Sequence, residues 1–219
     1  MLKKAVLVAV CAAMASAVSP VVEAQFKLPG KSSEAPAAGV DAVSMQDGVI
    51  KSYVSAKSNI DGGLAKFAEA YGLKDQAAQL DASAKALAGG ATSEDELKTN
   101  AKLSESTQQQ IEKKIAEGAA LSDEGKQLFA AGLLPYALGV KETTVLPKEL
   151  QAFSDAAKAQ ISSASALEKA KVTSKLKSGL WLAKELPGHT TKLTAGLSQI
   201  AGYAQKNSIP LPKEANDLL

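Results

Sequence analysis

Apolar residues recur at steps of three and four along most of this chain, the spacing that places side chains on one face of an α-helix. The first such stripe lies between Val49 and Tyr71, and others follow over about 74–87, 93–117, 123–146, 148–163, 166–186 and 190–206. The stripe over 93–117 differs because Ser104 and Thr107 make its middle polar. No stretch sustains the alternation of a half-buried strand. We therefore expect an all-α fold, a single antiparallel bundle of six or seven helices joined by short loops.

Capping residues, glycines and prolines indicate where these helices begin and end. Gly89-Gly90 is placed to end one helix, and Ser93-Glu-Asp-Glu supplies a capping box for the next. Proline is unfavourable inside a helix because it lacks an N–H group and clashes with the preceding turn. We therefore expect one break at Pro147 and a turn into the last helix at Pro187-Gly188. The two prolines within 209–212 predict an extended segment across the bundle.

Two adjacent glycines, Gly62 and Gly63, interrupt the first helix. Each costs about 1 kcal/mol relative to alanine in a helix interior, so their presence needs a reason. One interpretation is a hinge, and the other is a close crossing with a neighbouring helix. We favour the close crossing.

The most apolar segment after the N-terminal region is 128–140, thirteen residues without a charge. Such a segment belongs at the centre of a bundle, and Pro135 is expected to kink it. The kink also allows a second interpretation, in which the segment lines a cavity for an apolar ligand. The residues expected to line the core or such a cavity are Leu128, Phe129, Leu133, Leu134, Pro135, Tyr136, Leu138 and Trp181.

Trp181 lies in a lysine-rich stretch, 166–186, that allows two interpretations. A basic amphipathic helix of this kind can rest on anionic lipid. Glu168 and Glu185 dilute the positive face, however, and a lone tryptophan is typical of a core position. We favour packing of Trp181 in the core.

The first 24 residues have the layout of a secretory signal peptide: a positive start, an apolar run over 5–15, and small residues at Ala17 and Ala24 where cleavage can occur. The apolar run is too short for a permanent membrane span, which needs about 20 residues. We expect cleavage after Ala24, a flexible leader over 25–40 and a helical domain over 41–219. The mature protein is then periplasmic or secreted and has no stable span.

Composition narrows the function further. The only cysteine, Cys11, lies inside the predicted signal peptide, so the mature chain has no thiol. Acylation at Cys11 is disfavoured because Val10, rather than a small residue, precedes it. All 25 basic residues are lysines and the aromatic content is 4%, which argues against nucleic-acid recognition.

Candidate catalytic chemistry is sparse along the chain. The single histidine, His189, follows Pro187-Gly188, and we expect it in an exposed turn. No serine sits in a glycine-flanked nucleophile elbow, and no glycine-rich phosphate loop is present. The acidic groups at 94–96 and 123–124 lie where helix starts favour negative charge. We therefore expect no catalytic residue, no metal and no cofactor.

These observations favour a non-enzymatic protein of the bacterial cell envelope. The leading hypothesis is a binding or scaffold module that meets another envelope component through its helix faces. The alternative is a periplasmic carrier for a lipid or other apolar small molecule, held in a cavity lined by 128–140.

Overall fold

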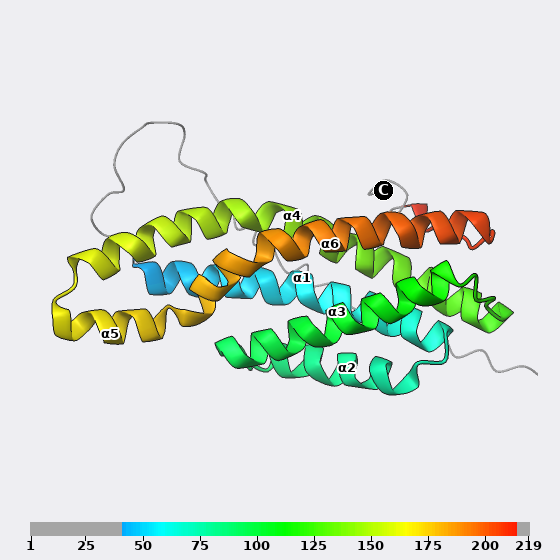
Figure 1. Ribbon diagram of the computed structural model, residues 1–219, viewed down its shortest axis with the longest axis horizontal. Helices are drawn as coiled ribbons and strands as arrows, with labels where there is room; N and C mark the ends of the chain where they lie inside the picture. Colours follow the sequence, from blue (N-terminus) through cyan, green and yellow to red (C-terminus); the bar gives the residue numbers. More distant parts are fainter. Residues whose placement is uncertain (1–40, 214–219) are drawn as a thin grey trace, which may run out of the picture. The chain divides into compact units, whose positions relative to one another are not determined.

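The computed structural model describes residues 41–213, and this part of the chain is helical with no strand (Figure 1). It contains six helices: α1 (Ala42–Ala70), α2 (Lys74–Ala88), α3 (Glu94–Ala116), α4 (Asp123–Ser163), α5 (Ala166–Lys175) and α6 (Lys177–Lys206). The all-α class is thereby confirmed for 41–213. The predicted signal peptide at 1–24 and leader at 25–40 lie outside the described residues. None of the six helices has both the length and the apolar character that a membrane span requires.

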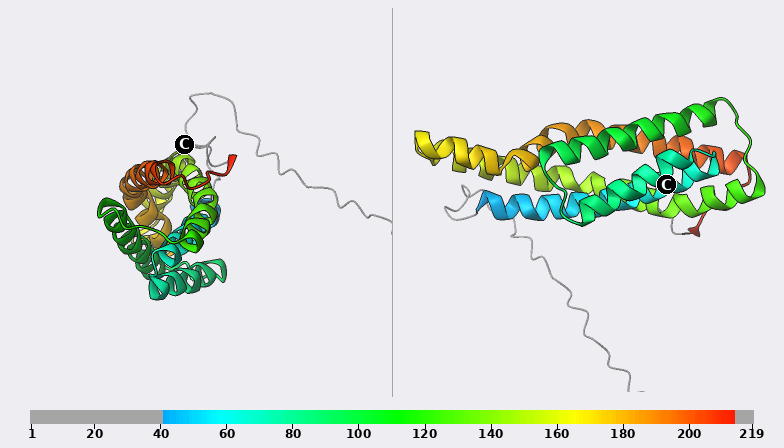
Figure 2. Two further views of the ribbon diagram at one scale, coloured as in Figure 1. Left: turned by 90° about the vertical axis from the view of Figure 1, so that its right-hand side faces the viewer. Right: turned by 90° about the horizontal axis from the view of Figure 1, so that it is seen from below.

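The long helices lie side by side and alternate in direction. Helices α1, α3 and α6 run one way and α2 and α4 run the other, as the colour gradient in Figure 1 shows. Helix α2 packs against α1 and α3 and lies away from α6 (Figure 2). Helix α1 therefore contacts α2, α3, α4 and α6, and side chains from four helices can meet around it.

Helices α1 and α4 approach each other most closely at glycines. A Cβ atom added at Gly63 would lie 2.5 Å from the Cβ atom of Tyr136 and 2.8 Å from the carbonyl oxygen of Gly132. One added at Gly139 would lie 2.6 Å from the carbonyl oxygen of Ala56. Gly62, by contrast, faces open space. The favoured interpretation of the glycine pair, a close helix crossing, is confirmed at Gly63.

Two apolar clusters fill the space between the helices. The first contains the aromatic side chains Phe67, Phe129, Tyr136 and Tyr203, whose rings pack in tilted and edge-to-face pairs at centroid distances of 4.6–5.6 Å. The second surrounds the other half of α1 and includes Tyr53, Leu146, Leu150, Phe153 and Leu176. Along α1, residues up to Ala56 belong to the second cluster and residues from Ile60 onward to the first. The junction between the clusters is polar.

Two of the expected helix breaks are wrong. Helix α4 continues through Pro147, and α6 continues through Pro187. The adjoining turns bury Leu150 in α4 and Leu186 in α6, and burial of each such side chain contributes about 1.5–3 kcal/mol. Summed over each helix face, this burial outweighs the roughly 3 kcal/mol cost of one internal proline. Within the predicted helix 166–186, the helix is instead interrupted at the fully buried Leu176, between α5 and α6.

The predicted starts of α3 and α4 and the non-helical tail agree with the structure. Ser93 caps α3 in a capping box with Glu96, and the Ser122 hydroxyl accepts from a backbone N–H group at the start of α4. Gly90 lies just after the end of α2 and has a φ of 99°, in the left-handed region that glycine adopts freely. Residues 209–212 are not helical, and Ile209 is buried against the first apolar cluster.

Candidate functional site

A buried polar network joins α1 to α3 at the junction between the two apolar clusters. The Lys57 ammonium donates to Oδ1 of Asp61 at 2.5 Å and to the hydroxyl of Ser104. The same Asp61 oxygen accepts from the Ser104 hydroxyl at 2.5 Å, and Oδ2 accepts from Nδ2 of Asn100 at 2.8 Å. Lys57, Asp61, Asn100 and Ser104 are each at most 5% exposed. The network therefore holds an ion pair out of water.

The electrostatics of this ion pair follow from its burial. Residues four apart lie on one face of a helix, so Lys57 and Asp61 share the face of α1 that packs inward. Burial lowers the pKa of Lys57, while the Asp61 carboxylate opposes that effect by favouring the ammonium. Removing one partner of such a pair typically costs about 3–5 kcal/mol, because the other charge stays buried without compensation. The hydrogen bonds from this pair to Asn100 and Ser104 tie α1 to α3.

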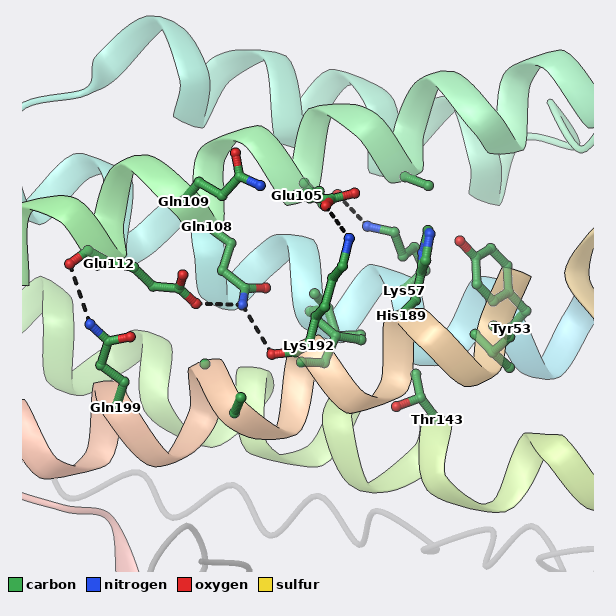
Figure 3. A pocket seen from close by; sticks show the side chains of 17 residues that line it. Tyr53, Lys57, Glu105, Gln108, Gln109, Glu112, Thr143, His189, Lys192 and Gln199 are labelled. Carbon is green, nitrogen blue, oxygen red and sulfur yellow. Dashed lines mark hydrogen bonds and ion pairs between the residues drawn. The ribbon is translucent and has the colours of Figure 1, made fainter. Parts of the chain in front are cut away.

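A cavity of about 320 Å³ lies beside this network, between α1, α3 and α6 (Figure 3). Thr143 reaches it from α4. Its apolar lining residues are Ile60, Ala101, Leu186, Leu193, Ala195 and Gly196. Its polar lining residues are Tyr53, Lys57, Ser104, Glu105, Gln108, Gln109, Glu112, Thr143, His189, Lys192 and Gln199. The site is therefore amphipathic.

Hydrogen bonds between α3 and α6 form one wall of the cavity. Lys192 donates to Glu105 at 2.5 Å, and this bond lowers the pKa of the Glu105 carboxyl. Gln108 donates to Glu112 at 2.7 Å and reaches the backbone oxygen of Lys192 at 3.4 Å. Gly196 makes room for these side chains, because a Cβ atom there would lie 2.8 Å from Oε1 of Glu112 and would collide with Nε2 of Gln108.

His189 lies at the end of the cavity nearest Lys57 and Tyr53 (Figure 3). It is half-buried, and burial lowers the pKa of its imidazole, with the nearby Glu105 acting in the opposite direction. Its ring meets that of Trp181 edge-on at a centroid distance of 6.5 Å. The expectation of an exposed turn histidine is wrong, because α6 continues through Pro187 and carries His189 inward.

The eight residues predicted to line the core or an apolar cavity lie outside the cavity between α1, α3 and α6. Phe129, Leu133 and Tyr136 are fully buried in the first apolar cluster, Leu128, Leu134, Pro135 and Trp181 are half-buried, and Leu138 is 37% exposed. Leu128 lines a separate hollow between α1, α2 and the start of α4, and Trp181 packs against the second cluster. The structure thus brings three of the predicted residues together, within the core.

Sequence reasoning missed the polar residues of the cavity, although two signals pointed to them. The polar middle of the 93–117 stripe contains Ser104, which lies in the buried network. Lys57 and Asp61 fall on either side of Ile60 within the apolar stripe of α1, and both are buried. Charged residues at such positions indicate a buried pair, because an isolated buried charge is too costly to keep. His189 and Lys192 were not predicted to lie in a site, because the sequence pattern predicts a helix that ends at Pro187, with both residues outside it.

The arrangement suits hydrogen bonding to a small molecule better than metal binding. Within residues 41–213, no group of three or more histidine, cysteine, aspartate or glutamate side chains is placed to hold a metal ion. No known protein family, curated protein or solved structure matches this chain.

Proposed function

We propose that this chain is an exported, non-enzymatic binding protein that holds a small, largely apolar molecule in the cavity between α1, α3 and α6. The observation that carries the proposal is the cavity, whose volume of about 320 Å³ lies at the lower end of the ~300–1,000 Å³ range of ligand sites. Ligand sites combine apolar side chains with polar groups that orient the ligand, and the lining of this cavity contains both. The proposed site differs from the cavity expected along 128–140.

The buried network supports a binding role over a catalytic one. Ser104 and Lys57 are the groups nearest to a nucleophile and a base, and Asp61 holds both of them. An ammonium bound to a carboxylate has no free electron pair with which to accept the serine proton. The pair instead supplies a fixed, polar end to the cavity.

Filling the cavity tests the proposed function. Leu193 lines the cavity, whereas Leu134 packs against the same apolar cluster away from it, and both are half-buried. Protein purified from its native cells under non-denaturing conditions is extracted and examined by mass spectrometry. We expect a small molecule to co-purify with the natural chain and with Leu134→Trp, but not with Leu193→Trp. Equal recovery from both variants, or none from the natural chain, contradicts the proposal.

Export is proposed on the basis of the predicted signal peptide. Intact-mass measurement and N-terminal sequencing of the protein from a periplasmic or culture fraction test it. We expect the mature chain to begin at Gln25. Recovery from the cytoplasm with residues 1–24 still attached contradicts export.

A second candidate function, binding to another envelope component through a helix face, is favoured by α5. No residue of this helix is buried, and Leu167 is 81% exposed beside the exposed Lys169, Lys171 and Lys175. An exposed apolar side chain with a lysine, Lys171, one turn along the same helix face suits a protein partner with an acidic surface around an apolar pocket. Lysine cross-linking in intact cells should join Lys169 or Lys171 to one other envelope protein.

A pair of matched variants tests this second candidate. Leu167→Asp should abolish the cross-link, whereas Val145→Asp, at another exposed apolar position, should leave it unchanged. Cross-links only to further copies of this chain, or a cross-link that survives Leu167→Asp, would exclude the hypothesis.

We also propose that the six helices form one antiparallel bundle with α4 kinked at Pro135. The close α1–α4 contact at Gly132 and Gly63, a few residues from this proline, supports the arrangement. Residual dipolar couplings measured on either side of Pro135 give the angle between the two halves of α4. Collinear halves would rule out the kink.

A further inference from the structure

Three side chains at one end of the cavity can each donate a hydrogen bond for which no acceptor is present among residues 41–213. Lys57 carries three ammonium protons, and its hydrogen bonds to Asp61 and Ser104 use two of them. Within residues 41–213, neither the Tyr53 hydroxyl nor the His189 imidazole forms a hydrogen bond, although Tyr53 is only 2% exposed. Figure 3 shows the Tyr53 hydroxyl pointing toward His189 and Lys57. These three side chains define the donor end of the cavity.

The charges around the donor end favour an acceptor as the ligand's head group. At this end Lys57 is paired with Asp61 and Lys192 with Glu105, so these two pairs carry no net charge, and the carboxylate of Glu112 lies farther along the cavity (Figure 3). A carboxylate has two oxygens that accept hydrogen bonds and none that donate, which matches three converging donors. A neutral histidine can also take up a proton beside an incoming carboxylate and balance its charge. An ammonium head group has only donors and cannot accept a hydrogen bond from Lys57.

The volume of the cavity limits the size of the ligand. The cavity volume of about 320 Å³ lies at the lower end of the ~300–1,000 Å³ range of ligand sites, so the ligand is small. The apolar side chains Ile60, Leu186 and Leu193 line the same cavity and suit an aliphatic or aromatic body. A small carboxylic acid with such a body fits both limits.

We infer that the cavity binds a small monocarboxylate amphiphile, with the carboxylate accepting hydrogen bonds from Lys57, Tyr53 and His189. The apolar body packs against Ile60, Leu186 and Leu193. This inference rests on the proposed ligand-binding function and adds the chemical class and the orientation of the ligand.

Three probes with one apolar chain and different head groups test the inference on the full-length protein: octanoate, 1-octanol and octylamine. Binding is measured by isothermal titration calorimetry and by the fluorescence of Trp181, the only tryptophan, whose ring meets His189. We expect octanoate to bind at least tenfold more tightly than either other probe, because a hydrogen bond to a charged group is worth about one factor of ten or more.

Two Tyr→Phe variants locate the head group. Tyr53→Phe removes a hydroxyl from the donor end and should weaken octanoate about tenfold while leaving 1-octanol unchanged. Tyr203→Phe is the matched control, because the Tyr203 hydroxyl donates to the backbone oxygen of Ala119 at 2.7 Å outside the cavity lining. It should leave octanoate binding unchanged.

The outcomes separate this inference from the proposed function. If 1-octanol binds as tightly as octanoate and Tyr53→Phe has no effect, the cavity binds ligands but the carboxylate assignment is overturned. Preference for octylamine overturns it too and places the head group at Glu112, whose carboxylate has no cation partner among residues 41–213. Failure of all three probes to bind counts against the proposed function itself.

Discussion

Replacing Gly62 and Gly63 by alanine, one at a time, separates the α1–α4 contact from the intrinsic cost of glycine. Both glycines lie well inside α1, so each substitution gains about 0.5–1 kcal/mol of helix stability. At Gly62 the new methyl group meets no atom within 4 Å, whereas at Gly63 it would lie 2.5 Å from the Cβ atom of Tyr136 and 2.8 Å from the Gly132 carbonyl oxygen. Because backbone atoms of α4 obstruct it, relief requires α4 itself to move.

Overpacking of this kind typically costs about 1–3 kcal/mol. We therefore expect Gly62→Ala to raise the free energy of unfolding by up to about 1 kcal/mol, and Gly63→Ala to lie about 1–3 kcal/mol below Gly62→Ala. The propensity gain cancels in that difference, which leaves only the packing cost.

Urea denaturation followed by far-ultraviolet circular dichroism gives the free energy of unfolding of both variants. In a thermal melt, each kcal/mol of difference between them corresponds to about 2–4 °C in Tm for a domain of this size. Equal stability of Gly62→Ala and Gly63→Ala would refute the close crossing and favour the hinge.

Three further predictions concern the polar network, the imidazole and a helix cap. Asp61→Ala should lower the free energy of unfolding, measured by urea titration, by about 3–5 kcal/mol. The double variant Lys57→Met/Asp61→Leu should recover most of that loss, since an apolar pair leaves no uncompensated charge. A double variant as unstable as Asp61→Ala would contradict the ion-pair argument. Burial lowers the pKa of His189 below the value of about 6.5 expected in the unfolded chain, with Glu105 opposing and Lys192, Glu185 and Lys57 also nearby. The contribution of neutral His189 to stability is therefore present above about pH 6.5 and is lost as the pH falls. Thermal unfolding between about pH 7 and pH 5 should show a shallower loss of stability for His189→Gln than for the natural chain, and parallel curves would argue against this. Ser93→Ala should destabilise α3 by about 1 kcal/mol, measured by the same urea assay, with no change expected for the exposed Ser106→Ala.

The candidate site was harder to predict than the helices that carry it. Local stripes covered all six helices, although they predicted boundaries at Pro147 and Pro187 and missed the one at Leu176. Lys57 and Ser104, by contrast, are 47 positions apart and meet only because whole helix faces pack together. A lysine four residues before an aspartate is usually an exposed surface pair. Only burial of the α1 face against α3 turns this pair into the polar end of a cavity.

The two prolines show how packing can override a local rule. Pro147 and Pro187 each remove one backbone hydrogen bond, and from sequence alone that loss predicts a break. Leu146 and Leu150, on the two sides of Pro147, are both buried in the second cluster. On the two sides of Pro187, Leu186 is buried in the second cluster and Leu197 in the first, and this burial keeps both helices continuous. The consequence for function is direct, since the continuity of α6 places His189 and Lys192 on the cavity wall.

The sequence by itself determined the all-α class and the capped starts of α3 and α4, and it favoured a close helix crossing at Gly62-Gly63 without identifying the partner helix. These features depend on contacts within a few residues, or on a residue type that only one backbone arrangement requires. Only the tertiary structure decided which helices continue through proline and which polar side chains meet at the cavity. Those outcomes depend on the free energy of burying entire helix faces, which no local window of the sequence contains.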